Sequence, residues 1–276
     1  MPFSGFPKIR PSLPPEYEKI YLQHIQENRR GQSPASSLST ALEGWMHRRI
    51  ARDARKSNPS TLEIGAGTLN HLRYESQNSA YDIVEPAHYL FDNSPSLGLV
   101  RSVYNDVKEV QPDTRYDRII SIASFEHICN LPEVVAHSGL LLKPGGQLRA
   151  AIPTEGGPVW KLGWKLTTGW EFKRRYGLDY EVIMRAEHVN TWREVSDVLN
   201  YFFQRVECSY LGLTRALSVY QVYICRDPDR MRCLSYLGLA REFCKSSALR
   251  GRPFFWYPRQ GSNLRPFAPE ANALIH

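Results

Sequence analysis

A short apolar run followed by two closely spaced glycines constrains the fold of this chain most. Residues 61–64 read Thr-Leu-Glu-Ile, and Gly65, Ala66 and Gly67 follow them. This order predicts a buried strand and then a glycine turn that opens a helix. Glycine allows the backbone to turn sharply, and it allows a ligand to approach the backbone closely because no Cβ stands in the way.

Carboxylates at two predicted strand ends indicate which ligand could bind at this turn. Glu63 lies two residues before Gly65, and Glu85 ends a second apolar strand over residues 80–85. Their separation is close to the about 20 residues expected for a ribose-binding acid in a βαβ unit. A dinucleotide would bring a diphosphate, which Glu63 would repel, and its third fingerprint glycine is replaced here by Asn70. A phosphate-free cationic nucleoside such as S-adenosylmethionine fits the two acids better.

Further elements follow in an order typical of an open α/β sheet. The turn residues Pro144, Gly145 and Gly146 precede a fifth strand. Two helices are expected before the first strand. The expected helices cover residues 16–30, 39–55 and 191–199, and Ser39 or Thr40 would cap the second of them. The further strands are expected over residues 99–104, 116–123, 147–150, 204–210 and 217–225. We divide the chain into an N-terminal helical segment (1–57), a domain over 58–228 with an insertion at 154–190, and a poorly ordered C-terminal tail (229–276).

The motifs in residues 60–153 resemble those of the class I S-adenosylmethionine-dependent methyltransferases. They are E-I-G-A-G, the strand end at Glu85, Y-D-R-I-I-S-I-A-S-F-E-H-I and L-L-K-P-G-G. The chain is most similar to the type 11-like, small-molecule group that includes quinone-biosynthesis methyltransferases, although Leu69 stands where many members have a small residue. The resemblance implies an α/β fold: a Rossmann-like seven-stranded, mostly parallel sheet with helices on both faces and an α-helical, aromatic insertion after strand 5.

The same resemblance implies a set of cofactor-binding residues at the strand ends. Glu63 and the glycine turn would surround the methionine portion, Glu85 would accept both ribose hydroxyls, and Asp106 would face the adenine amino group. Asp106 could instead cap the turn that follows it. The expected cofactor-binding residues are Glu63, Gly65, Ala66, Gly67, Glu85, Asp106, Ser121 and Ala123.

Methyl transfer from a sulfonium needs alignment of the acceptor and, for an oxygen or nitrogen nucleophile, removal of a proton. His127 follows the fourth strand and His188 closes the insertion, so either histidine could be the catalytic base. The aromatic insertion reads as a lid over the substrate or as a structural cover for the sheet edge. Its candidate substrate-binding residues are Trp160, Trp164, Tyr176 and Tyr180. We expect no bound metal.

Charge and cysteine content bear on the partners and the compartment. The net charge of +7 arises mainly after residue 230, where seven basic residues meet two acidic ones. Such a tail can contact phosphates or simply be solvated, and we expect the second. No apolar run is long enough to span a bilayer, and five cysteines without a C-x-x-C pair favour a reducing cytoplasm.

The sequence therefore predicts an S-adenosylmethionine-dependent methyltransferase with a small-molecule acceptor and no nucleic-acid partner. An RNA methyltransferase stays open as an alternative, because bases could stack on the aromatic, basic insertion. A non-catalytic interaction protein with the same fold is a second alternative, although Glu63, Glu85 and both glycines are present. The identity of the acceptor and the oligomeric state are not specified by the sequence.

Overall fold

The computed structural model describes residues 2–18, 20, 34–52, 58–76 and 80–240. Within these residues one seven-stranded sheet has the order β3-β2-β1-β4-β5-β7-β6. Neighbouring strands are parallel from β3 to β5, and β7 runs antiparallel to β5 and β6, which confirms the predicted sheet. The strands are β1 (Thr61–Ile64), β2 (Tyr81–Val84), β3 (Ser102–Tyr104), β4 (Tyr116–Ile122), β5 (Leu142–Pro153), β6 (Phe203–Gly212) and β7 (Ser218–Pro228).

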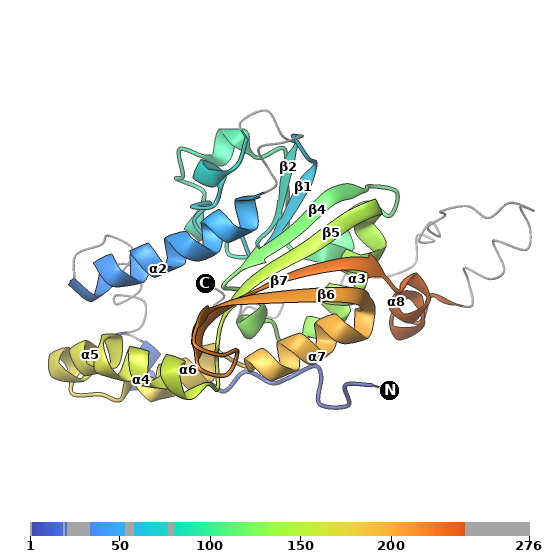
Figure 1. The fold of residues 1–276 in the computed structure, drawn as a ribbon. Helices are drawn as coiled ribbons and strands as arrows, with labels where there is room; N and C mark the ends of the chain where they lie inside the picture. The colour runs from blue at the N-terminus through green and yellow to red at the C-terminus, as the bar shows by residue number, and fades with distance from the viewer. Residues whose placement is uncertain (1, 19, 21–33, 53–57, 77–79, 241–276) are drawn as a thin grey trace, which may run out of the picture.

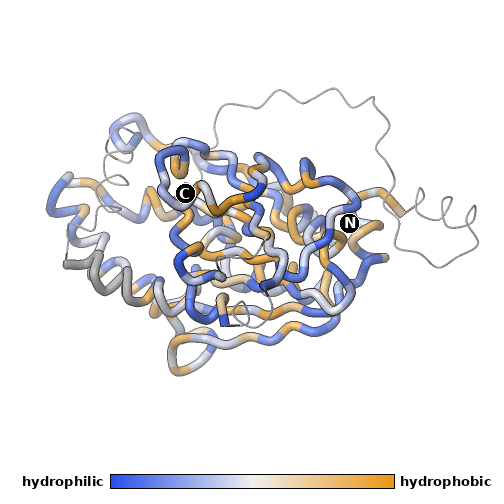
Figure 2. The backbone as a smooth tube through the Cα atoms, turned by 90° about the horizontal axis from the view of Figure 1, so that it is seen from above, coloured by the Kyte–Doolittle hydropathy of each residue, from blue (hydrophilic) through white to orange (hydrophobic). Residues whose placement is uncertain are grey.

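Helices cover both faces of the sheet (Figure 1). Helix α2 (Pro34–Ile50) packs on β4, β5 and β7, while α3 (Leu131–Leu141) and α7 (Trp192–Phe202) pack on the opposite face. Alternate residues of a strand point to opposite faces, so Ile119 joins the core under α3 and Ile120 joins the core under α2. Figure 2 shows hydrophobic residues recurring through the middle of the molecule.

The predicted insertion after strand 5 forms three short helices. They are α4 (Pro158–Leu166), α5 (Thr168–Tyr176) and α6 (Tyr180–Glu187), and Figure 1 shows them together beside the end of β5. Phe172 and Ile183 form a small core of their own with Tyr17 of the N-terminal segment. The Tyr17 hydroxyl accepts a hydrogen bond from the Asp179 backbone N–H at 3.0 Å, so this segment is attached directly to the insertion.

The prediction of a helix directly after the glycine turn is wrong. Residues 66–76 form turns and one 3-10 helix, η2 (Leu72–Tyr74). Leu69 has a φ of 63°, which interrupts an α-helix, and the side chains of His71 and Glu75 are turned into a buried polar network. Similar 3-10 helices, η3 (His88–Leu90), η4 (Leu97–Leu99) and η5 (Val107–Glu109), stand between later strands.

The N-terminal helices also differ in part from the prediction. Helix α2 begins at Pro34, before the predicted cap at Ser39 or Thr40, because proline is well tolerated in the first turn of a helix. The expected helix over 16–30 is described only at residues 15–18 and 20, and the rest of it lies outside the described residues. Helix α7 begins where predicted, since Thr191 and Glu194 form a capping box.

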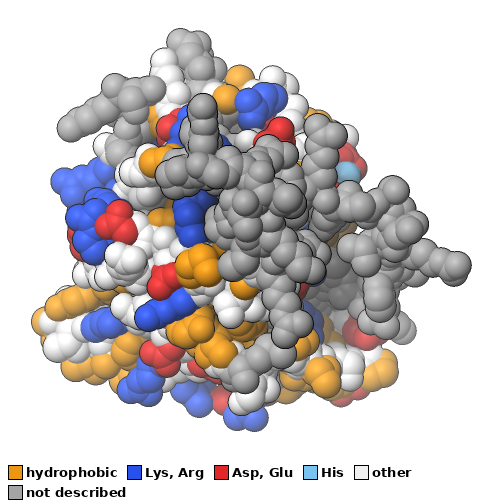
Figure 3. All heavy atoms as spheres, turned by 90° about the vertical axis from the view of Figure 1, so that its right-hand side faces the viewer, with side chains coloured by type: hydrophobic (Ala, Val, Ile, Leu, Met, Phe, Trp, Pro, Cys, Tyr) orange, Lys and Arg blue, Asp and Glu red, His pale blue; other side chains and the backbone are white. Residues whose placement is uncertain are grey.

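The segment expected to be a C-terminal tail starts with a helix. Helix α8 (Arg230–Tyr236) buries Cys233 and Leu234 against α3 and α7, and residues 241–276 lie outside the described part. On the face drawn in Figure 3, acidic and basic side chains intermingle with hydrophobic ones where the chain is described. No helix among the described residues combines the length and hydrophobicity that a bilayer crossing needs.

Candidate functional site

The glycine turn after β1 packs tightly against the turn after β4. Gly65 and Gly67 have φ values of 72° and 52°, in the left-handed region that favours glycine. A Cβ placed on Gly65 would lie only 2.0 Å from Ser124 Oγ. Ala123, next to that serine, also adopts a positive φ of 49°, which is unfavourable for a residue with a Cβ. The ends of β1 and β4 are therefore held in one fixed arrangement.

Glu85 ties the glycine turn to the end of β2. Its Oε2 accepts a hydrogen bond from the Gly67 backbone N–H at 2.8 Å, and its Oε1 accepts one from the Ala87 N–H at 2.9 Å. The side chain has no exposed surface. The sequence placed this acid beside the turn, and the structure brings the two together.

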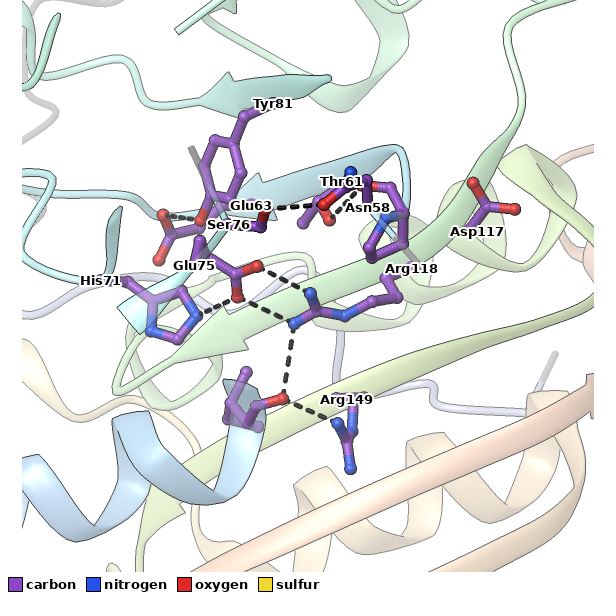
Figure 4. A network of polar contacts seen from close by, with 12 residues as sticks. Asn58, Thr61, Glu63, His71, Glu75, Ser76, Tyr81, Asp117, Arg118 and Arg149 are labelled. Atoms are coloured by element: carbon purple, nitrogen blue, oxygen red, sulfur yellow. Dashed lines mark hydrogen bonds and ion pairs between the residues drawn. The ribbon is translucent and has the colours of Figure 1, made fainter. Parts of the chain in front are cut away.

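Glu63 lies beneath the turn, in the polar layer on the α2 side of the sheet (Figure 4). Its Oε2 accepts a hydrogen bond from the Tyr81 hydroxyl at 2.7 Å. Burial raises the pKa of Glu63 to about 8, and this hydrogen bond offsets only part of that increase. From the sequence we expected Glu63 to be an ionised carboxylate at the end of the strand. In the structure it is instead a buried carboxyl group that favours its neutral form.

Figure 4 also shows a buried ion pair below Glu63. Arg118 donates to both carboxylate oxygens of Glu75, at 2.8 and 3.0 Å, and His71 contacts the same carboxylate at 2.7 Å. These contacts outweigh burial and lower the pKa of Glu75 to about 2. Arg118 and Arg149 both donate to the backbone carbonyl of Ile50, so the network holds the C-terminal end of α2 on the sheet.

The remaining expected cofactor residues occupy the same edge of the sheet. Ala66 and Ser121 are buried, and Ser121 Oγ has no hydrogen-bond partner among the described residues. Asp106 is exposed and caps η5, where its Oδ1 accepts a hydrogen bond from the Lys108 N–H at 2.9 Å. The alternative role considered for Asp106, a cap, is therefore present, and it leaves the carboxylate at the surface.

His127 and His188 meet although they are distant in sequence. Their ring centroids lie 4.7 Å apart with the rings nearly perpendicular. His127 belongs to the 3-10 helix η6 (Phe125–His127), directly after β4, and His188 ends α6. His127 Nδ1 contacts the Glu187 backbone carbonyl at 3.0 Å, and His188 Nδ1 contacts Glu155 Oε2 at 2.6 Å. Both rings are thereby held in defined orientations.

Three charged residues near these histidines had no role in the sequence prediction. Glu126 stood inside a motif that was recognised for its neighbours and Glu155 inside the predicted insertion, so only their proximity to a histidine could have drawn attention to them. Arg10 gave no signal at all. It donates to the His127 carbonyl at 2.7 Å and to Glu187 Oε2 at 2.9 Å, and so brings the N-terminal segment to the histidines.

The four expected substrate-binding aromatics divide into two groups. Trp160 lies beside the histidines, because its Nε1–H donates to Glu155 Oε2 at 2.7 Å and its ring stacks toward His188 at 6.4 Å. Trp164, Tyr176 and Tyr180 instead pack inside the insertion, around Phe172 and one another. The structure therefore brings only Trp160 of this set to the candidate catalytic histidines.

The structure thus combines a mostly parallel α/β sheet with a glycine turn held by Glu85 at the ends of β1 and β2. The chain matches the family Methyltransf_23, described as a methyltransferase domain, over residues 36–205. The match covers more than half of the sequence, and the chain belongs to this methyltransferase domain family.

Comparisons with individual proteins agree with this family. Malonyl-[acyl-carrier protein] O-methyltransferase 2 of Ilyobacter polytropus is 32% identical over 92 residues, which are 31% of this chain and 36% of that protein. The match thus spans about a third of the relative's length. The plantazolicin methyltransferase BpumL, solved with a monoazolic desmethylPZN analog and SAH, has a TM-score of 0.53 at 13% identity and covers 77% of this chain and 91% of its own. The N-methyltransferase NodS from Bradyrhizobium japonicum WM9, solved with S-adenosyl-L-homocysteine, gives 0.50 at 13% identity, with 78% and 99% covered. The two structures support the fold.

Proposed function

We propose that this chain transfers a methyl group from S-adenosylmethionine to a small-molecule acceptor. The family membership supports the reaction, and both structural neighbours were solved with the demethylated cofactor. The observation that carries the proposal is Glu85, a buried carboxylate at the end of β2 that joins the glycine turn after β1. That is the place where a parallel α/β sheet holds the ribose of a nucleoside.

Glu85 has the hydrogen-bonding capacity for this role. Each carboxylate oxygen takes one backbone N–H, and an ionised carboxylate has about four acceptor sites, so ribose hydroxyls can be accepted as well. The turns at residues 67 and 87 have to separate for a ribose to enter, because the carboxylate has no exposed surface. We assign the methionine portion to Gly65, Ala66 and Gly67, with Glu63 beneath them.

The other expected cofactor residues have supporting roles in this proposal. The unpartnered Ser121 hydroxyl at the end of β4 offers a polar contact, and Ala123 keeps the following backbone close to the glycine turn. Asp106 reaches adenine only if it exchanges its contact with the Lys108 N–H for the adenine amino group. The bound cofactor supplies a methyl group on a sulfonium, which leaves as a neutral thioether.

The acceptor would lie between the histidine pair and the insertion. The His188 ring is oriented by Glu155 and flanked by Trp160, an arrangement suited to taking a proton from a bound hydroxyl or amine. His127, held by the Glu187 carbonyl, is the second candidate base. One neighbour was solved with a desmethylPZN analog and one relative is named for malonyl-acyl-carrier protein, which supports a metabolite rather than RNA. The described cysteines are free thiols, in keeping with a cytoplasmic enzyme.

Cofactor binding is tested directly by calorimetry with S-adenosylhomocysteine. We expect wild-type protein to bind it and Glu85→Ala to bind it at least about 100-fold more weakly, because two hydrogen bonds to a charged group are lost. Glu207→Ala, on the exposed edge strand β6, is the matched control and should bind normally. Unchanged affinity in Glu85→Ala, or binding of a nicotinamide dinucleotide in place of the nucleoside, would contradict the assignment.

The catalytic role of the histidines needs turnover as well as binding. His188→Gln should retain cofactor affinity and lose about 100-fold or more in kcat, the usual contribution of a positioned base. His137→Gln, on α3, is the control for loss of an imidazole elsewhere.

Labelled methyl transfer to a metabolite extract and to RNA identifies the acceptor class, and labelling of RNA alone would overturn the small-molecule assignment. If variants at both His127 and His188 turn over normally, the reaction uses no histidine base.

A further inference from the structure

Three side chains that can bind a metal ion converge behind the end of β4. The potential ligand atoms of Glu126, His127 and His188 all lie within 4.8 Å of one another. Glu126 is 2% exposed and His127 5%, and 12% of the His188 side chain is exposed, so the group is open to solvent only at His188. Glu126 and His127 come from η6 and His188 from the end of α6, and the site is therefore assembled from the sheet and the insertion together.

Both imidazole rings direct Nδ1 at an oxygen atom. A carbonyl oxygen can only accept, so His127 Nδ1 carries the proton that it donates to the Glu187 carbonyl, and Nε2 keeps the lone pair. His188 Nδ1 lies 2.6 Å from Oε2 of the Glu155 carboxylate, which accepts a hydrogen bond, so the same tautomer is favoured. Histidines that bind metals are typically oriented in this way, through a carbonyl or carboxylate on the opposite ring nitrogen.

Glu126 provides an independent indication of a ligand. Its Oε2 is buried and has no hydrogen-bond partner among the described residues, and its Oε1 lies 3.8 Å from His127 Nε2. Leaving a carboxyl oxygen buried without a partner is costly, and a cation between the three side chains would satisfy it. Next to the group, the Trp160 ring stacks toward His188 and Arg10 donates a hydrogen bond to the His127 carbonyl.

We propose that Glu126, His127 and His188 form a binding site for a divalent transition-metal ion, with two imidazole nitrogens and one carboxylate as its protein ligands. Two imidazoles favour zinc, cobalt or iron over magnesium and calcium, which prefer oxygen ligands. Small side-chain rotations, on the order of 1 Å, bring the three atoms to the about 2.1 Å bonds of such an ion. The sequence expectation of no metal came from the absence of a local ligand motif, whereas these ligands come from two distant segments.

Three protein ligands leave a coordination position for an exogenous oxygen or nitrogen, as in catalytic zinc sites. With an ion on both imidazoles the histidines would not accept a proton, and the ion would instead lower the pKa of a coordinated acceptor group. This consequence rests on the proposed methyltransferase function, whereas metal binding itself does not.

The test is a titration of the full chain after chelator treatment and dialysis. Calorimetry with zinc and with cobalt should give one site per chain with micromolar or tighter affinity, and magnesium should bind at least about 10-fold more weakly. Glu126→Gln and His188→Gln should each weaken binding about 100-fold, and Glu155→Gln, which acts through His188, about 10-fold. His88→Gln removes an exposed imidazole that contacts Asn105 and should leave the affinity unchanged.

The wild-type protein decides the proposal even if a variant fails to fold. Absence of a one-to-one site up to about 1 mM zinc or cobalt would overturn it. So would equal affinity in Glu126→Gln and His188→Gln, with folding checked by circular dichroism, because the ion would then lie elsewhere. Cobalt titration followed by visible absorbance reports the coordination without cofactor or acceptor. A parallel titration with S-adenosylhomocysteine separates the two proposals, since its failure alongside metal binding would count only against the methyltransferase function.

Discussion

At the scale of single residues, Gly65 is constrained by a neighbour and by its backbone conformation. A Cβ at this position would lie 2.0 Å from Ser124 Oγ and 2.5 Å from Ser124 Cβ, in addition to the strain of a φ of 72°. Gly177, which ends α5, has nearly the same φ of 71°, but no atom of the described residues lies within 4 Å of such a Cβ. Alanine substitution at the two glycines therefore distinguishes the free energy lost to backbone strain from the free energy lost to overpacking.

We expect Gly65→Ala to destabilise the protein more than Gly177→Ala. Both variants lose about 1 kcal/mol to the left-handed conformation, and Gly65→Ala loses a further 1–3 kcal/mol, roughly, to overpacking. Urea unfolding gives the difference in the free energy of unfolding. Combining Gly65→Ala with Ser124→Gly should recover most of the extra loss, because Ser124 Cα would be 3.9 Å away. Equal destabilisation by the two alanines would show that the contact with Ser124 is easily relieved.

At the scale of elements, α2 is fixed to the sheet by buried charges as well as by apolar packing. The side chains of Arg118 and Glu75 are 2% and 1% exposed, and Arg118 also donates to the last carbonyl of the helix, that of Ile50. Removing one member of a buried pair leaves the other charge without compensation, which typically costs 3–5 kcal/mol, roughly. Exposed pairs contribute far less.

We therefore predict that Arg118→Met lowers the free energy of unfolding by about 3–5 kcal/mol. Arg205→Met breaks the exposed pair between Arg205 and Asp227 and should unfold at nearly the wild-type urea concentration. Hydrogen exchange adds a local readout, since α2 amides should lose protection in Arg118→Met before those of β4. If the two variants unfold alike, the buried pair is not what holds α2.

The strands of this fold were predictable from sequence because their signals are local. The apolar runs over residues 61–64, 80–85 and 116–123 marked β1, β2 and β4 directly, and the capping box at Thr191 marked the start of α7. The helix expected after Gly67 was not formed, because Glu75, which His71 contacts, pairs with Arg118 on β4, a partner that no window around residue 70 contains. Glu126 and Glu155 were missed for the same reason, since their significance arises only when His188 approaches them.

At the scale of the whole molecule, buried groups give the stability a characteristic pH dependence. Burial lowers the pKa of His47 to about 3 and also lowers the pKa of His71 and His137, so folding favours their neutral forms. Below their unfolded pKa of about 6.5 these histidines destabilise the folded state, and stability rises with pH until that value is passed. Glu63 and Glu126, with pKa values raised to about 8 and about 7, act in the opposite direction.

For Glu63 the sign is set by the proton that the folded protein retains. Between the unfolded value near 4.5 and the folded value of about 8, the unfolded chain has lost this proton and the folded chain keeps it, so stability falls as pH rises. Glu63→Gln mimics the protonated group and still offers an acceptor to the Tyr81 hydroxyl. In urea unfolding from pH 5 to 8, the free energy of unfolding of Glu63→Gln should therefore rise relative to that of wild type, by up to about 1.4 kcal/mol per pH unit. The exposed Glu18, changed to Gln, should follow the wild-type profile throughout. Parallel profiles for Glu63→Gln and wild type would mean that this carboxyl ionises normally in the folded protein.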